Sequence, residues 1–343
     1  MNTIQPFPEL GQFLVDQGLT RSAHINVEPL SGGQSNPTFR IDCADKQFVL
    51  RKQPQGTLLK SAHAIDREFR VITALHNSDV PVPRTYEYVH DNSITGTPFY
   101  LMDYVEGRIL MAPSLPGMLA GERRAIYTEM NRVIAALHSV DVSAVGLDDF
   151  GRPGNYFARQ IKRWSMQCKA ATLPVSATMQ RLMEWLPQNI PSVEETTLVH
   201  GDFRMDNLIF HPTQPRVIAV IDWELSTLGH PLADFSYHCM SWHVPPSLWR
   251  GTAGLNLAYL EIHSEAEYID LYESATGREV KEHWDFYMAY NFFRMAAIFH
   301  GIAQRSLDGN SASTDAVETG KKAEPFAELA WHFAHRYATN FCQ

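Results

Sequence analysis

One segment constrains this 343-residue chain more than any other: a short polar loop followed, farther along, by a carboxylate at the end of an apolar strand. The loop is His200-Gly201-Asp202, in LVHGDFRMDNLIF, and Asn207 comes shortly after it. The strand is VIAVIDWE, whose Asp222 lies 15 positions beyond Asn207. An isolated HGD triplet is typical of a turn or a helix cap. The spacing of the other two polar residues favours a functional site instead.

The pattern H-x-D-x-x-x-x-N has the spacing of a kinase catalytic loop. Phosphoryl transfer needs a carboxylate that accepts the proton of the attacking hydroxyl, and oxygen ligands that hold Mg²⁺ against the nucleotide phosphates. Asp202 suits the first role, and Asn207 and Asp222 suit the second, because Mg²⁺ prefers oxygen ligands. Arg204 occupies the place of a kinase Lys near the transferring phosphate and can neutralise charge there. His200 is expected to brace the loop.

HGDxxxxN followed by an ID-[WF]-E strand end resembles the aminoglycoside phosphotransferase and choline kinase superfamily. The resemblance covers most of the chain, in the expected order, and implies ATP and Mg²⁺ as cofactors. It also implies an α+β, two-lobed, protein-kinase-like fold. GHPLADFSYH, residues 229–238, is similar to the superfamily's G-x-P-x-x-D segment. In that segment Asp234 would accept backbone hydrogen bonds from the catalytic loop, a structural rather than catalytic role.

The periodicity of the chain agrees with two lobes. Residues 1–105 contain β-type runs and one helical pattern, which predict a small lobe with an antiparallel sheet and one main helix. Its predicted elements are strands 38–43, 47–52 and 99–104 and helix 62–77. Residues 106–343 predict a larger, mainly helical lobe. Its elements include helices 121–139, 155–169, 176–186 and 283–304, strands 207–210 and 217–221, and a polar loop at 306–319 before a final helix.

A glycine-containing segment, LSGGQSN at residues 30–36, resembles the loop that covers the phosphates between the first two strands of the superfamily's fold. Gly32 and Gly33 would let backbone amides approach phosphate oxygens. Ser35 and Asn36 can add side-chain hydrogen bonds. An ordinary hairpin turn is the alternative interpretation.

Two adjacent basic residues compete for the phosphate-contacting position in FVLRKQP. Alternation places Arg51 and Lys52 on opposite faces of the strand. Matching the motifs puts Arg51 where a protein kinase has the Lys of V-A-I-K, with Glu68 placed to pair with it. The alternative makes Lys52 the phosphate ligand. Adenine recognition is expected from backbone groups around Asp103, Tyr104 and Val105, which leaves ATP and GTP undistinguished.

Two further segments, residues 150–167 and 292–313, resemble the kinase-like domains attached to some acyl-CoA dehydrogenases. That subfamily implies phosphorylation of a hydroxyl on a 4-hydroxyacyl-CoA or a related hydroxy acid. Arg159, Lys162 and Arg163 would share one helix face, which suits an anionic substrate. A solvated basic face is the alternative.

Other residues are candidates for the acceptor pocket. Asp206 follows the catalytic loop and could hydrogen-bond a second polar group of the acceptor. In this superfamily the helices after the catalytic loop form the acceptor pocket. The residues that could line it here are Trp242, His243, Tyr287, Tyr290 and His300. Aromatic residues at helical spacing also occur in cores. Residues 240–343 hold 13 acidic and 8 basic residues, so an aminoglycoside or a choline-like amino alcohol is the second candidate acceptor.

Bulk properties exclude other classes of protein. The net charge is -9, with both signs interspersed, so we expect no nucleic-acid partner. The amino terminus lacks a secretory pattern, and no apolar run reaches the roughly 18 residues of a membrane span. We therefore expect a cytoplasmic protein without membrane contact. Its four cysteines form no CxxC pair, which predicts free thiols. A non-catalytic, nucleotide-binding relative of kinases remains an alternative, and the sequence does not indicate the oligomeric state.

Overall fold

The computed structural model describes residues 6–30, 36–55, 64–308 and 316–341. The chain divides into two units. The first comprises Met1–Ile109, Ser143–Leu147 and Asn207–Ser226, and the second comprises Leu110–Val142, Asp148–Asp206 and Thr227–Gln343. This division differs from a single boundary after residue 105, because two later segments join the first unit.

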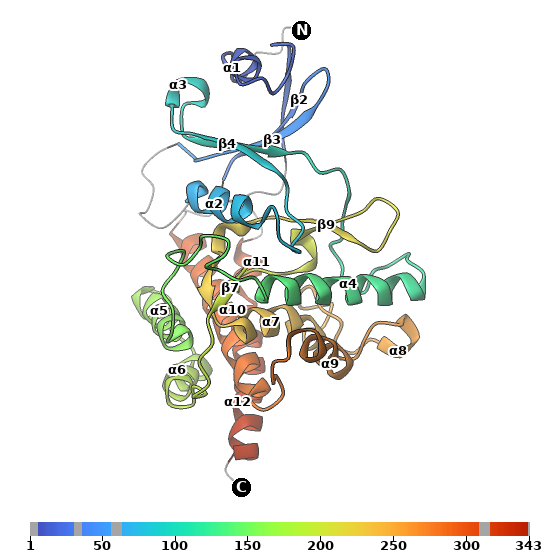
Figure 1. Ribbon diagram of the computed structural model, residues 1–343. Coiled ribbons are helices and arrows are strands. Elements are labelled where there is room, and N and C mark those ends of the chain that lie inside the picture. Colours follow the sequence, from blue (N-terminus) through green and yellow to red (C-terminus); the bar gives the residue numbers. More distant parts are fainter. Residues whose placement is uncertain (1–5, 31–35, 56–63, 309–315, 342–343) are drawn as a thin grey trace. The chain divides into compact units, whose positions relative to one another are not determined.

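A five-stranded antiparallel sheet organises the first unit. Its order is β1 (Asn26–Pro29), β2 (Thr38–Asp42), β3 (Gln47–Lys52), β5 (Phe99–Asp103) and β4 (Thr85–Val89). Phe48 and Leu50 point to one face and join an apolar core with α1 (Leu10–Asp16). The other face carries Arg51 and is covered by α2 (Ile65–Leu75) (Figure 1). A short helix, α3 (Asn92–Thr95), precedes β5.

Residues 207–226 belong to this unit because backbone hydrogen bonds connect them to it. β6 (Arg108–Ile109), β8 (Leu208–Phe210) and β9 (Val217–Val220) form a second antiparallel sheet, and η3 (Trp223–Leu225) packs against α2. The close approach of β6 requires a glycine just before it. A Cβ on Gly107 would lie 2.4 Å from the Phe210 carbonyl oxygen, far inside normal contact.

The second unit is mainly helical. Its helices are α4 (Ala120–His138), α5 (Tyr156–Ala170), α6 (Ala177–Trp185), α7 (Pro231–Cys239), α8 (Leu257–Leu260), α9 (Glu265–Thr276), α10 (Trp284–Leu307), α11 (Ala316–Gly320) and α12 (Ala323–Phe341). Helix α10 is buried on nearly all sides by α5, α7, α11 and α12 (Figure 1), as expected for a helix that is apolar all round. β7 (Thr197–Val199) pairs with β10 (Thr227–Gly229). Short 3₁₀ turns, η1 (Leu186–Gln188), η2 (Met205–Asn207) and η4 (Met240–Trp242), complete the order.

The predicted elements are present with modest shifts, and the α+β fold class is confirmed. The sheet contains two strands, β1 and β4, beyond the three expected. The polar loop expected at 306–319 is shorter, because α10 extends to Leu307 and α11 begins at Ala316; residues 309–315 lie outside the described part. Cys43, Cys168 and Cys239 are free thiols, as predicted, and Cys342 is not described. No helix in the described ranges combines the length and the hydropathy needed to cross a membrane.

Candidate active site

Arg51 is the centre of a buried group of charges in the first unit. Its Nε lies 2.8 Å from Glu68 Oε2, and its Nη2 lies 2.8 Å from Asp222 Oδ1. Arg51 is 7% exposed and Glu68 is 1% exposed. The expected pair of Arg51 and Glu68 is therefore present, and it joins β3 to α2.

Burial determines the electrostatics of this pair. It raises the pKa of Glu68 to about 7, although the neighbouring Arg51 charge opposes the shift. Burial also disfavours the Arg51 charge, but Glu68 and Asp222 outweigh it, so the pKa of Arg51 is raised and the guanidinium stays charged. The first unit thus keeps a permanent cation on the α2 side of its sheet.

Lys52 points to the opposite face of the same strand. Its Nζ donates to the Thr95 carbonyl oxygen and lies 5.1 Å from the centre of the Phe7 ring. The alternation predicted from the sequence is therefore observed. Lys52 therefore lies on the face of the sheet that packs against α1, and Arg51 and its acidic partners lie on the other face.

Asn207 immediately precedes β8 and Asp222 follows β9, at the open end of this hairpin. The Ile221 amide donates to the Asn207 carbonyl oxygen over 3.0 Å, which brings the two candidate metal ligands together. Asp222 has a φ of +67°, a left-handed conformation that aspartate tolerates better than most residues. One amide and one carboxylate oxygen fit Mg²⁺, which commonly takes its other ligands from phosphates and water. Within the described ranges, no group of three or more His, Cys, Asp and Glu residues could hold a metal alone.

The other residues predicted to contact nucleotide are only partly visible. Gly32, Gly33 and Ser35 lie outside the described residues, and Asn36 is fully buried at the start of β2. Asp103 accepts a 2.5 Å hydrogen bond from the Tyr86 hydroxyl and pairs with Lys46 at 3.3 Å. Tyr104 and Val105 follow it in the segment that leads to β6, and both are half-buried.

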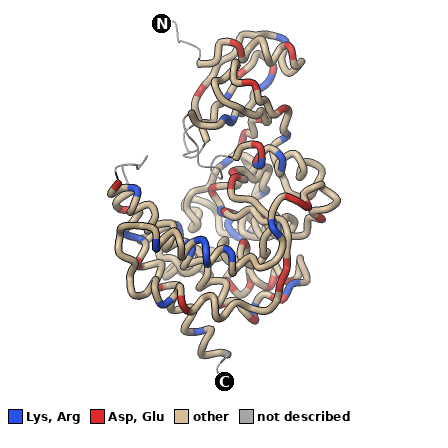
Figure 2. Tube along the Cα trace, turned by 90° about the vertical axis from the view of Figure 1, so that its left-hand side faces the viewer, with Lys and Arg blue, Asp and Glu red and all other residues tan. Residues whose placement is uncertain are grey.

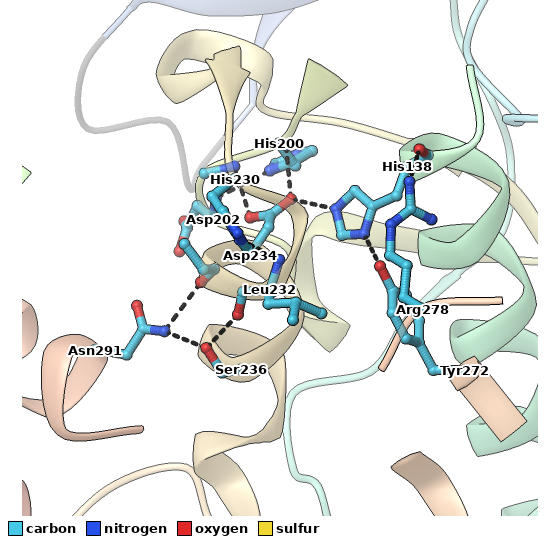
Figure 3. A network of polar contacts seen from close by, with 12 residues as sticks. His138, His200, Asp202, His230, Leu232, Asp234, Ser236, Tyr272, Arg278 and Asn291 are labelled. Atoms are coloured by element: carbon cyan, nitrogen blue, oxygen red, sulfur yellow. Dashed lines mark hydrogen bonds and ion pairs between the residues drawn. The ribbon is translucent and has the colours of Figure 1, made fainter. Parts of the chain in front are cut away.

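In the second unit, a buried carboxylate holds the backbone of the HGD loop (Figure 3). Asp234 accepts hydrogen bonds from the amides of His200 and Gly201, over 2.7 and 2.9 Å. Gly201 has a φ of +82°, a conformation that suits glycine. The structural role expected for Asp234 is confirmed.

A second layer fixes Asp234 itself (Figure 3). His138 Nε2 lies 3.3 Å from Asp234 Oδ2, and His138 Nδ1 lies 2.6 Å from the Tyr272 hydroxyl. Burial alone would raise the pKa of Asp234, but hydrogen bonds from His138 and His200 lower it. Burial lowers the pKa of His138.

Both carboxylate oxygens of Asp202 have partners within the second unit. The Tyr237 hydroxyl donates to Oδ1 over 2.5 Å, and Arg204 Nε lies 3.2 Å from Oδ2. Arg294, buried in α10, donates to the Gly201 carbonyl oxygen over 2.6 Å and lies 5.1 Å from the centre of the Tyr237 ring. The loop is thus held by side chains from α7 and α10.

Asp206 pairs with two arginines. Arg204 Nε lies 3.4 Å from Asp206 Oδ1, and Arg250 donates to Asp206 Oδ2. The side chains of Arg204 and Arg250 are 30% and 34% exposed. Asp206 therefore orients two partly exposed cations.

A cavity opens beside these residues, wholly within the second unit. Most of its wall is apolar, with four methionines, and its polar residues include Arg204, Asp206, Tyr237 and Arg250, which belong to the Asp202 and Asp206 contacts described above. The lining residues are Met111, Pro113, Tyr127, Met130, Arg204, Met205, Asp206, Tyr237, His238, Met240, Ser241, Val244, Trp249 and Arg250. Met side chains adapt to apolar ligands of different shapes.

The later aromatic candidates lie elsewhere. Trp242 is buried, donates to the His263 carbonyl oxygen over 2.8 Å, and packs on Tyr268. Tyr290 and His300 are buried in α10. None of these three lines the cavity, so the core interpretation describes them better.

Two more candidates occupy different environments. Tyr287 also lies in the core, where it stacks on Phe157. His243 is half-buried, and its Nε2 lies 2.6 Å from Glu265.

The basic stripe on α5 is only partly available. Arg159 donates to the backbone carbonyls of Arg152 and Gly154, which uses its guanidinium to hold the preceding turn. Lys162 and Arg163 are exposed. Elsewhere in the described chain, basic and acidic positions are interspersed (Figure 2).

Sequence reasoning missed Tyr237, Arg250 and Arg294. A signal existed for one of them. Tyr237 follows Asp234 by three positions, so both share one face of α7, the face turned to the HGD loop. Arg250 and Arg294 carry no comparable local signal.

Comparisons with known proteins agree with this geometry. Residues 26–278 match the model of the phosphotransferase enzyme family. The chain is 51% identical to mouse acyl-CoA dehydrogenase family member 10 over 88% of its length, and 39% identical to the human family member 11 over 95%. It spans 28% and 42% of those proteins, so it matches less than half of each.

Solved structures show the same fold. A proposed aminoglycoside phosphotransferase from Ralstonia eutropha is 49% identical, with a TM-score of 0.89 over 95% of this chain and 97% of that one. Choline kinase from Cryptosporidium parvum has a TM-score of 0.67 at 11% identity, covering 96% of both chains. An aminoglycoside phosphotransferase complexed with AMP-PNP and hygromycin B has a TM-score of 0.60 at 16% identity, covering 94% of this chain and 98% of that one. The fold is kinase-like, and the chain belongs to the phosphotransferase enzyme family.

Proposed function

We propose that this protein transfers the γ-phosphate of ATP to a hydroxyl group on an acceptor with an apolar body, best a 4-hydroxyacyl-CoA or a related hydroxy acid. One observation carries the choice of acceptor: the cavity beside Asp202 is mostly apolar and lined by methionines. Such a wall suits an acyl chain better than a polycationic sugar. The names of the relatives, which are acyl-CoA dehydrogenase family members, support the same class of substrate.

In the proposed reaction one bond to the γ-phosphorus forms and one breaks. The acceptor hydroxyl oxygen forms a bond to the γ-phosphorus while the bond from that phosphorus to the β,γ-bridging oxygen breaks, and ADP leaves. Asp202 orients the hydroxyl and accepts its proton. Arg204 offsets charge on the transferring phosphoryl group.

The nucleotide roles fall to residues of the first unit. Arg51, held by Glu68, would contact the phosphates, and Asn207 and Asp222 would hold Mg²⁺, which supplies charge neutralisation at the phosphates. Gly32, Gly33, Ser35 and Asn36 would cover the phosphates, and the backbone of 103–105 would contact the base. These assignments follow from the motif matches and from the oxygen ligands described above.

The acceptor end is assigned from charge. Arg204 and Arg250 are oriented by Asp206 at the cavity wall. Arginine binds anionic oxygens through a planar donor fork, so the acyl chain would lie in the cavity with its polar end toward Arg250. A cationic acceptor would meet these two arginines unfavourably.

A substrate panel tests the proposal. Phosphate transfer from Mg-ATP is measured with 4-hydroxyacyl-CoAs of increasing chain length, the free hydroxy acids, choline and kanamycin. We expect turnover with the hydroxyacyl compounds, rising with chain length until the cavity is full. Turnover confined to choline or kanamycin would reject the acyl acceptor, and no turnover with any compound would favour a non-catalytic nucleotide-binding protein.

A charge placed in the cavity provides a sharper test. Met111 lines the cavity and is 55% exposed, so Met111→Lys should fold normally. We expect a higher KM for the acyl acceptor and an unchanged KM for Mg-ATP. Met166→Lys is the matched control, because Met166 is equally exposed, at 56%, on α5.

A further inference from the structure

The carboxylate of Asp202 is held by two side chains that differ in burial. Tyr237 is 7% exposed, and its ring is confined between α7 and the buried guanidinium of Arg294. Arg204 is 30% exposed and shared between Asp202 and Asp206. Tyr237 is therefore the fixed partner and Arg204 the adaptable one.

The hydroxyl of Tyr237 is a permanent donor. Burial and the nearby Asp202 charge raise its pKa well above the ordinary tyrosine value. It therefore keeps its proton near neutral pH. A carboxylate oxygen has two lone pairs, so this bond uses one acceptor position on Oδ1 and leaves room for an acceptor hydroxyl.

The same ring forms part of the cavity wall. Its hydroxyl contacts Asp202 over 2.5 Å, and its ring touches the space beside Arg204 and Met205. One side chain thus connects the shape of the cavity with the orientation of the carboxylate. Arg294 contacts the Tyr237 ring and also donates to the Gly201 carbonyl oxygen, so it connects the ring with the HGD loop.

We propose that Tyr237 is a positioning residue, which holds the Asp202 carboxylate toward the cavity and keeps it from turning into a two-point pair with Arg204. The inference rests on the proposed function, since it assigns Asp202 as the proton acceptor. Tyr237 neither gains nor loses a proton during the reaction. Its contribution is geometric, and small displacements of a catalytic group are costly.

Tyr237→Phe tests this in the full chain, because it keeps the ring in the cavity wall and removes only the hydroxyl. We expect kcat for the acceptor to fall by about 10- to 100-fold, with an unchanged KM for Mg-ATP. Tyr337→Phe is the control. Its hydroxyl also has a side-chain partner, His283 Nδ1 at 3.0 Å, and neither of these two residues lines the cavity.

A double variant separates positioning from general support of the fold. If Tyr237 acts through Asp202, Tyr237→Phe causes no further loss of the residual single-turnover activity of Asp202→Asn. An additional loss as large as that in the wild-type background would overturn the inference. A kcat of Tyr237→Phe equal to that of the wild type would also overturn it.

Crystal structures of the wild type and of Tyr237→Phe give a readout that does not depend on turnover. We expect the Asp202 carboxylate to rotate toward Arg204 in the variant. An unchanged carboxylate would reject the positioning role even if the enzyme is active. A protein that phosphorylates no acceptor but shows the rotation would reject the proposed function while leaving the positioning role intact.

Discussion

The ion pairs at the candidate site differ in burial between the two units. The first unit buries an ion pair, Arg51 with Glu68, under helix α2. The second unit buries neutral imidazoles: burial lowers the pKa of His230 and of His238 to about 4. The two ion pairs beside its cavity, Arg204 with Asp206 and Arg250 with Asp206, are partly exposed.

This difference fits the two tasks. A buried cation whose partner is fixed cannot reorient, so Arg51 suits a ligand that is always the same, such as a triphosphate. Partly exposed arginines can adjust, which suits an acceptor whose body varies. Removing either charge of the Arg51–Glu68 pair should destabilise the first unit, because the remaining buried charge would have lost its partner.

The largest expected effect separates chemistry from nucleotide binding. Asp202→Ala should lower kcat by roughly 10²- to 10⁴-fold, because it removes the proton acceptor. The affinity for Mg-ATP, measured by titration calorimetry, should be nearly unchanged, since the residues proposed to bind the nucleotide lie in the first unit. Turnover near the wild-type value would remove Asp202 from the proposed mechanism.

Removing the buried cation should damage the first unit. Arg51→Ala leaves Glu68 buried without its partner, so we expect a loss of about 3–5 kcal/mol in the free energy of unfolding, with weaker nucleotide binding. The loss should grow with pH. The pKa of Glu68 is about 7 with Arg51 present and would be higher without it, whereas the unfolded state ionises near pH 4.5, so stability present below pH 4.5 is lost as pH rises.

Two controls accompany the Arg51 variant. Glu68→Gln in the Arg51→Ala background should flatten the pH dependence, because it removes the titrating group. Lys52→Ala, on the other face of β3, should leave nucleotide affinity intact. Loss of affinity confined to the Lys52 variant would reverse the assignment of the phosphate ligand.

Asp222→Ala should affect binding rather than the chemical step. We expect the Kd for Mg-ATP to rise by about 10- to 100-fold, in line with the loss of a metal ligand or its support. Because Asp222 also pairs with Arg51, Asp222→Asn is the second variant, which keeps an oxygen ligand. Calorimetry at several Mg²⁺ concentrations checks the result, and equal affinities in wild type and variants would contradict the metal role.

The effect that is smallest near neutral pH concerns the buried imidazoles. His230 caps α7 by accepting from the Leu232 amide over 3.2 Å. Its pKa is about 4 in the folded state, against an ordinary value of 6.5, so the unfolded state binds a proton first as pH falls. Stability that is present above pH 6.5 should decline by up to about 1.4 kcal/mol per pH unit toward pH 4.

His230→Asn checks this dependence, since asparagine retains a capping oxygen but does not titrate. We expect urea unfolding of the variant to show a shallower loss between pH 6.5 and 5 than the wild type. An equally steep loss in both proteins would assign the acid sensitivity to other groups, such as His238 or His138.

Local patterns in the sequence determined much of this protein. The HGD loop with Asn207 and Asp222 indicates the reaction class, and strand alternation places Arg51 and Lys52 on opposite faces. These features depend on neighbours along the chain, whose geometry follows from strand and helix periods. The helices were predictable for the same reason.

Only the tertiary structure decided which distant residues meet. Arg51 pairs with Asp222 across 171 positions, and the cavity combines Met111 with residues of α4 and α7 and with Trp249 and Arg250. The Tyr237 bond to Asp202 depends on how α7 packs against the HGD loop. Such contacts arise from packing between elements, which no local pattern records, and they are the contacts from which the acceptor and the role of Tyr237 were inferred.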